Sequence, residues 1–150
     1  MSVITQRQSS RPVEVLLVED NPGDIRLTQE AFKEGRVFVN LTVANDGVEA
    51  MELLKGQAAN GKRRPDLILL DLNLPRKNGR EVLVEIKADE ELRRIPVIVM
   101  TTSKAEQDIH RAYNLNANCY ITKPVELDEF LNVVRSIEDF WLTIVTLPRE

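Results

Sequence analysis

Three near-continuous aliphatic runs are the feature that most constrains how this chain can fold. They span residues 13–18 (VEVLLV), 67–70 (LILL) and 96–101 (PVIVMT). A strand with one covered face alternates apolar and polar residues, whereas an unbroken aliphatic run is typical of a parallel strand covered on both faces. Two further candidates, residues 37–44 and 118–121, are more polar and suit the edges of the same sheet.

Helix start signals lie between these strand candidates. Residues 21–24 (NPGD) combine a capping Asn, a proline at the first helical position and an acid in the first turn. Three further pairs have the spacing of a capping box, although only the serine pair matches its strict form. These pairs are Asp46 with Glu49, Asn78 with Glu81, and Ser103 with Glu106.

The alternation of five strands with five helices predicts an α/β domain. Because the first, third and fourth strands are the most apolar, we expect a doubly wound parallel sheet of the flavodoxin-like (βα)5 class, with strand order 2-1-3-4-5. Residues 1–12 are expected to form a flexible N-terminal arm. Residues 13–140 are expected to form the domain, and residues 141–150 a short apolar C-terminal extension.

The composition limits the cellular compartment and the classes of binding partner that we expect. The 150 residues include one cysteine, so an internal disulfide is excluded and a reducing, cytoplasmic compartment is favoured. The formal net charge of −4 argues against broad electrostatic binding to nucleic acid or to a membrane surface. No apolar run approaches the ~18–20 residues of a membrane-spanning helix, and residues 1–12 lack the apolar core of a signal peptide.

Acidic residues follow two of the predicted central strands. Glu19 and Asp20 come directly after the first aliphatic run, and Asp71 follows the second. In a sheet of this order the functional crevice lies beyond the carboxyl ends of the first and third strands. Two like charges ~4 Å apart repel by about 4 kcal/mol at an effective dielectric constant near 20, so the cluster calls for a cation. Oxygen ligands alone suit Mg²⁺; the alternative is a set of exposed loop acids.

Asp71 is the best-placed nucleophile of this group, because it ends the central strand between the other acids and the ends of the next strands. A carboxylate beside Mg²⁺ can attack a phosphoryl donor and become an aspartyl phosphate. Lys123 can neutralise one phosphoryl oxygen, and Thr101 can donate a hydrogen bond to another. Glu19 and Asp20 then hold the metal, with a backbone carbonyl near Asn73 as a further ligand.

Four segments, in order, resemble the receiver domain of bacterial two-component response regulators. They are LLVEDNPGD (16–24), LILLDLNLPRKNG (67–79), PVIVMTTS (96–103) and CYITKP (119–124), and the resemblance covers about residues 13–140. It implies a phosphoacceptor signalling protein rather than a metabolic enzyme. The residues so implied are Asp71 as acceptor for a sensor histidine kinase, Glu19 and Asp20 as the acidic pair, Thr101 and Tyr120 as the switch hydroxyl and aromatic, and Lys123 as the invariant lysine.

A narrower resemblance extends toward the C-terminus. Residues 71–87, 118–124 and especially 140–148 (FWLTIVTLP) resemble the stand-alone response regulators that partner bacterial phytochromes. This implies a phytochrome-type kinase as the source of the phosphoryl group. Only 26 residues follow Pro124, too few for a DNA-binding module, so we expect output through proteins such as a downstream phosphotransfer protein.

The stretch after residue 139 is apolar and β-prone, and it would be an aggregation hazard if left exposed. It either folds back over its own domain or pairs with a second copy. A two-fold dimer is the commonest oligomer, so we expect a homodimer. The predicted interface residues are Phe140, Trp141, Leu142, Ile144, Val145 and Leu147.

Two other functions remain open from the sequence. A Mg²⁺-dependent phosphatase also forms an aspartyl phosphate, but such enzymes resemble a DxDx[TV] pattern on the first strand, where this chain has Glu19-Asp20-Asn21. A phosphorylation-independent docking receiver would share the fold without the chemistry. Incorporation of phosphate at Asp71 distinguishes the leading interpretation from the second of these.

Overall fold

The computed structural model describes residues 12–59, 64–72, 74, 76–101, 119–122 and 126–146. These residues contain a five-stranded parallel sheet with the order β2-β1-β3-β4-β5, which confirms the predicted fold class and strand order. The strands are β1 (Val13–Val18), β2 (Val39–Ala44), β3 (Leu67–Asp71), β4 (Val97–Thr101) and β5 (Cys119–Thr122).

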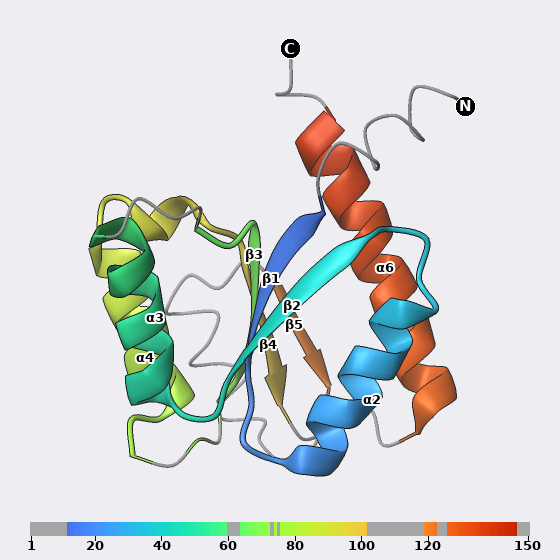
Figure 1. Cartoon of the computed structure of the whole chain (residues 1–150), viewed down its shortest axis with the longest axis horizontal. Helices are drawn as coiled ribbons and strands as arrows, with labels where there is room; N and C mark the ends of the chain where they lie inside the picture. The colour runs from blue at the N-terminus through green and yellow to red at the C-terminus, as the bar shows by residue number, and fades with distance from the viewer. Residues whose placement is uncertain are drawn as a thin grey trace.

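Helices cover both faces of this sheet. Helices α2 (Pro22–Lys33) and α6 (Leu127–Thr146) lie on one face, and α3 (Gly47–Ala59) and α4 (Gly79–Ala88) lie on the other (Figure 1). A short 3₁₀ turn, η1 (Leu92–Arg94), leads from α4 toward β4. The helix predicted from Ser103 lies outside the described residues.

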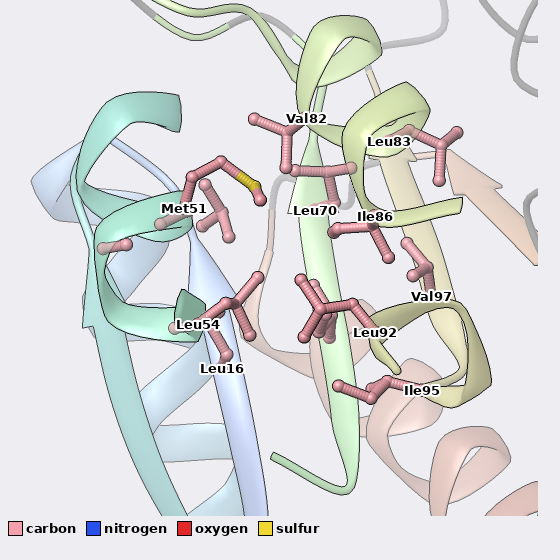
Figure 2. Close-up of a cluster of buried hydrophobic side chains, with 14 of the residues drawn as sticks. Leu16, Met51, Leu54, Leu70, Val82, Leu83, Ile86, Leu92, Ile95 and Val97 are labelled. Carbon is pink, nitrogen blue, oxygen red and sulfur yellow. The ribbon is translucent and has the colours of Figure 1, made fainter. Parts of the chain in front are cut away.

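Burial on both faces explains why the central strands are aliphatic without alternation. Along β1, Leu16 and Val18 pack into the cluster under α3 and α4, whereas Val15 and Leu17 pack into the cluster under α2 and α6. Strands β3 and β4 divide their side chains in the same way. Figure 2 shows the first cluster, in which Leu16 and Leu70 of the sheet face Met51 and Leu54 of α3 and Val82, Leu83 and Ile86 of α4.

The predicted start signals that lie within the described residues cap their helices. The Asn21 side chain accepts a hydrogen bond from the Asp24 amide at 3.0 Å, which caps α2. At α4 the amide of Glu81 donates to the Asn78 side chain, and the Glu81 carboxylate accepts from the Asn78 amide, both at 3.0 Å. This is a complete reciprocal capping box, although Asn stands where the strict form has Ser or Thr.

The last helix corrects one expectation. The stretch 141–147 is β-prone by composition, yet α6 continues without a break to Thr146, a length of 20 residues. Its apolar positions repeat at helical spacing from Phe130 through Val134 and Ile137, and the sequence continues that spacing at Trp141. Because helix growth is cooperative and no glycine or proline intervenes before Pro148, this periodicity outweighs the local β preference.

Helix α6 rises past the end of the sheet in Figure 1. Its last turns therefore extend beyond the layer formed by the strands. Within the described part of the chain, no helix is both long enough and apolar enough to cross a membrane.

A buried carboxylate ties α6 to the turn between α2 and β2. Glu138 is 2% exposed and accepts hydrogen bonds from the Val37 amide at 3.1 Å and from Arg36 Nε at 3.4 Å. Arg36 also donates to the exposed Asp139 at 2.7 Å, and this bond is the chief cause of the raised pKa of the Arg36 guanidinium. A Cβ at Gly35 would overlap Oε2 of Glu138, so the carboxylate would have to shift if residue 35 carried a side chain.

Candidate functional site

The carboxyl ends of β1 and β3 bring three acids together. Glu19 and Asp20 directly follow β1, and Asp71 is the last residue of β3, the neighbouring strand. Val18 is paired with Leu70, so the next residues of the two strands lie at the same level of the sheet. One carboxylate oxygen from each of the three acids lies within 4.8 Å of the others.

The three acids differ in exposure. Glu19 is 1% exposed and Asp71 is 5% exposed, whereas Asp20 is open to solvent. The Glu19 amide donates to the Ala44 carbonyl at 2.9 Å, which extends the pairing of β1 with β2 by one residue. The Asn21 amide donates to Oε2 of Glu19 at 3.2 Å, and so directs that carboxylate toward the cluster.

This donor set fits a hard divalent cation. Three carboxylates at these separations repel one another by about 4 kcal/mol per pair at ~4 Å and an effective dielectric constant near 20. A bound cation replaces that repulsion with attraction. Oxygen ligands from two or three acids, one of them open to solvent, leave coordination positions for water, and this is the arrangement that Mg²⁺ prefers.

The start of α4 holds the backbone of Asp71. The Gly79 amide donates to the Leu72 carbonyl at 3.0 Å. A Cβ at Gly79 would overlap the carbonyl oxygen of Asp71 and lie 2.5 Å from the Cα of Leu72. Residue 79 is therefore glycine because the first turn of α4 approaches the strand end closely, and this contact fixes the direction in which Asp71 leaves the sheet.

The loop between β3 and α4 contains a strained residue. Arg76 has a φ of 63°, a left-handed conformation that costs a residue with a side chain about 1 kcal/mol or more. Its Nε and Nη2 lie 3.0 and 2.8 Å from Oδ2 of Asp46, which directly precedes α3. The other oxygen of Asp46 accepts from the Glu49 amide at 2.8 Å, and this bond, followed by the contact with Arg76, lowers the pKa of Asp46.

Sequence reasoning missed the pairing of Asp46 with Arg76. It found Asp46 as a helix cap, from its spacing to Glu49, but nothing in the local pattern joins it to a loop 30 residues later. An arginine at a position that needs a left-handed backbone also has no sequence signal, because Gly and Asn are the usual residues there.

The remaining predicted residues are placed only in part. Thr101 ends β4 and Tyr120 lies in β5, so the structure describes their strand positions. Asp71 is paired with Met100, and Thr101 with Thr122. Asn73, Lys123 and Leu147 lie outside the described residues. The other five predicted interface residues belong to α6: Phe140, Trp141, Leu142, Ile144 and Val145.

Residues 15–135 match the response regulator receiver domain family. The match covers most of the chain and includes all three clustered acids. Together with the strand order and the position of the acids, it shows that the chain belongs to this family. Receiver-domain response regulators act as phosphoacceptor signalling proteins, and receiver domains bind Mg²⁺ through an acidic pocket.

The similar proteins include response regulators of phytochromes. The chain is 49% identical over 142 residues to the response regulator Rcp1 of Synechocystis sp., covering 94% of this chain and 97% of that protein. The crystal structure of the phosphorylated cyanobacterial phytochrome response regulator RcpA matches with a TM-score of 0.80 and 51% identity, over 89% of this chain and 96% of that one.

Two further solved structures are relevant, one to the metal site and the other to the kinase. The Mn²⁺-bound form of Rcp1 matches with a TM-score of 0.78 and 48% identity, over 87% of this chain and 95% of that one. The bacteriophytochrome response regulator AtBRR matches with a TM-score of 0.70 and 38% identity, over 83% and 91% of the two chains. The chain is thus related to phytochrome response regulators, and these relatives imply a histidine kinase as partner.

Proposed function

We propose that this protein accepts a phosphoryl group on Asp71 from a sensor histidine kinase, in a reaction that depends on Mg²⁺. The observation that carries the proposal is the meeting of Glu19, Asp20 and Asp71 at the ends of two adjacent central strands. Asp71 is the member that ends a buried strand and whose backbone is fixed by Gly79.

The chemistry follows from the acids themselves. A carboxylate oxygen of Asp71 attacks the phosphorus of the kinase phosphohistidine; the P–N bond breaks, a P–O bond forms, and the imidazole leaves with the electron pair. Glu19, Asp20, Asp71 and the backbone carbonyl of Asn73 would hold Mg²⁺. When bound, the ion neutralises the charge that gathers on the phosphoryl oxygens.

Three residues complete the proposed switch. Lys123 neutralises a phosphoryl oxygen, Thr101 donates a hydrogen bond to another, and Tyr120 takes up the space that Thr101 leaves. The strand register supports this arrangement: Asp71 is level with Met100, so Thr101 lies one residue further along. Thr101 is level with Thr122, so Lys123 comes one residue beyond that pair. Phosphorylation then shifts the population of two packings of the partner-binding face.

The proposed kinase is of the phytochrome type. The support is the similarity to RcpA, a cyanobacterial phytochrome response regulator, and to AtBRR, a bacteriophytochrome response regulator. We place the protein in the cytoplasm, which the single cysteine supports. The output is a protein–protein contact, for which a downstream phosphotransfer protein is the proposed partner.

A homodimer is part of the same proposal. The support is the length of α6, whose last turns extend beyond the sheet and carry an apolar sequence. A second copy that covers these turns would remove apolar surface from water. A solution mass equal to one chain at micromolar concentration, with and without phosphorylation, would remove this part of the proposal.

The deciding experiment is phosphorylation of purified protein. Incubation with a phytochrome-type kinase and ATP, or with acetyl phosphate, should label the wild type in Mg²⁺ and leave it unlabelled in excess chelator. Asp71→Asn should stay unlabelled. Asp66→Asn is the matched control: Asp66 precedes the other end of β3 and accepts a hydrogen bond from the Glu14 amide at 2.8 Å, far from the cluster.

Other outcomes favour the alternative functions. Full labelling of Asp71→Asn would place the acceptor elsewhere. A wild type that binds its partner yet takes up no phosphate from either donor would be a docking receiver. Sustained hydrolysis of an added phosphomonoester would make it a Mg²⁺-dependent phosphatase rather than a phosphoacceptor.

A further inference from the structure

A network of contacts links the start of α3 to the loop that follows the acceptor strand. Asp46 and Gly47 provide the contacts on the α3 side. Asp46 holds Arg76 through two nitrogens on one carboxylate oxygen, at 3.0 and 2.8 Å. A Cβ at Gly47 would overlap the carbonyl oxygen of Lys77, so the first residue of α3 also lies directly against this loop.

The far end of the loop is fixed as well. The Asn78 capping box starts α4, and Lys77 Nζ lies 2.6 Å from Glu85 Oε1 on the same helix. Gly79 then contacts the backbone of Asp71 and Leu72. Asp71 and Leu72 are thus held against the start of α4, and among the described residues of the loop Arg76 and Lys77 contact the start of α3.

The ion pair with Asp46 can hold the strained backbone of Arg76 in place. Without the contact to Asp46, a residue with a side chain tends to leave the left-handed region. Arg76 lies five residues after Asp71, and a change of its backbone would alter the path of the loop that leads from the acid cluster to α4. Asp46 is well suited to hold the loop, because its side chain is only 15% exposed and its other oxygen is occupied by capping α3.

We propose that Asp46 and Arg76 are positioning residues, which hold the loop after Asp71 in the conformation that binds Mg²⁺. The inference rests on the proposed function. It predicts that loss of either partner weakens Mg²⁺ binding, although neither residue belongs to the acid cluster.

The direction of the change in Mg²⁺ affinity distinguishes a positioning role from a simple effect of charge. By charge alone, removal of the cation Arg76 should tighten Mg²⁺ binding and removal of the anion Asp46 should weaken it. Positioning predicts that both changes weaken it. The chosen substitutions keep other features: Asn still caps α3 at position 46, and Met at position 76 keeps a long unbranched side chain and the backbone strain while removing the charge.

The test is a calorimetric titration of Mg²⁺ into the full chain. Asp46→Asn and Arg76→Met should each raise the dissociation constant about threefold, the scale of an exposed ion pair, and the double variant should be no weaker than either. Arg93→Asn removes one exposed positive charge on η1 and should leave the constant unchanged. With acetyl phosphate at saturating Mg²⁺, the phosphorylation rates of all variants should stay within about twofold of the wild type, since only ion affinity has changed.

Two results would overturn the inference: tighter Mg²⁺ binding in Arg76→Met, or additive losses in the double variant. Either result is compatible with a wild type that is phosphorylated normally, so the proposed function would stand. A wild type that binds no Mg²⁺ would instead overturn the proposed function, and the positioning role of Asp46 and Arg76 would fall with it.

Discussion

Among the residues that the structure describes, two glutamates are almost fully buried, and the charges beside them have opposite sign. Glu138 of α6 is 2% exposed and faces the guanidinium of Arg36 and the amide of Val37. Glu19, after β1, is 1% exposed and lies among the carboxylates of Asp20 and Asp71. The first lies beside a cation of the protein itself, whereas the second has two further carboxylates beside it.

The comparison distinguishes a structural acid from a functional one. Burial of a carboxylate is costly unless a partner compensates the charge. At Glu138 the charge is compensated by Arg36, and this contact joins α6 to the α2–β2 turn. At Glu19 the two neighbouring acids raise the cost, and we expect a bound cation to offset it. Burial alone therefore does not mark a site; the sign of the neighbouring charges does.

The largest expected effect comes from removal of the structural acid. Glu138→Ala leaves the Val37 amide without its buried acceptor, and should lower the free energy of unfolding by about 2–3 kcal/mol. Asp139→Ala, at the next and exposed position, removes another partner of Arg36 and should cost less than about 0.5 kcal/mol. Chemical denaturation measures both. Equal losses would mean that burial of Glu138 contributes nothing, and the comparison would fail.

A smaller effect is expected where α4 meets the functional acid. Gly79→Ala forces a Cβ into the backbone of Asp71 and Leu72, and should cost about 2 kcal/mol and reduce phosphorylation of Asp71. Gly56→Ala in α3 is the matched control, because a Cβ there meets nothing within 4 Å. It should gain about 0.5–1 kcal/mol. A Gly79→Ala protein as stable and active as the wild type would contradict the close contact.

Neutralisation of the functional acid should have the opposite sign to loss of the structural one. In chelator, Glu19→Gln should raise the free energy of unfolding by about 1 kcal/mol, because one repelling charge is gone. In millimolar Mg²⁺ the wild type should gain stability, and Glu19→Gln should gain much less. Thermal melts with and without Mg²⁺ measure both. Destabilisation of Glu19→Gln in chelator would mean that its surroundings already compensate the charge.

The smallest effect concerns acid sensitivity near α3. The pKa of Asp46 is lowered from its ordinary value of 3.8, chiefly by the Glu49 amide and further by Arg76. A carboxyl whose folded-state pKa is depressed stabilises the protein above the unfolded pKa, and this contribution is lost as the pH falls through the folded value. Asp46→Asn should therefore show a shallower loss of stability below about pH 4. An unchanged slope in acid denaturation would show that these bonds contribute little.

Most of the fold could be predicted because short stretches of the sequence carry the pattern of each strand and helix. The unbroken runs in β1, β3 and β4 reflect burial on both faces, and the greater polarity of β2 and β5 placed them at the edges. The three clustered acids could be found for the same reason. Each comes at the end of such a run, and parallel strands bring their carboxyl ends to one edge.

Long-range side-chain contacts could not be predicted in this way. Arg36 meets Glu138 across 102 residues, and Arg76 meets Asp46 across 30, and no local spacing records either pair. The end of α6 was misjudged for a different reason. Its last residues prefer strands individually, but the helical spacing that begins at Phe130 extends through them.

The most direct test of the central claim is a calorimetric titration of Mg²⁺ into the wild type and Asp20→Asn. Asp20 is exposed, so this change removes a ligand without disturbing the core. The wild type should bind one ion per chain, and Asp20→Asn should bind at least about tenfold more weakly, a difference of roughly 1.4 kcal/mol. Equal affinities, or no binding to the wild type, would contradict the claim that these acids form a cation site.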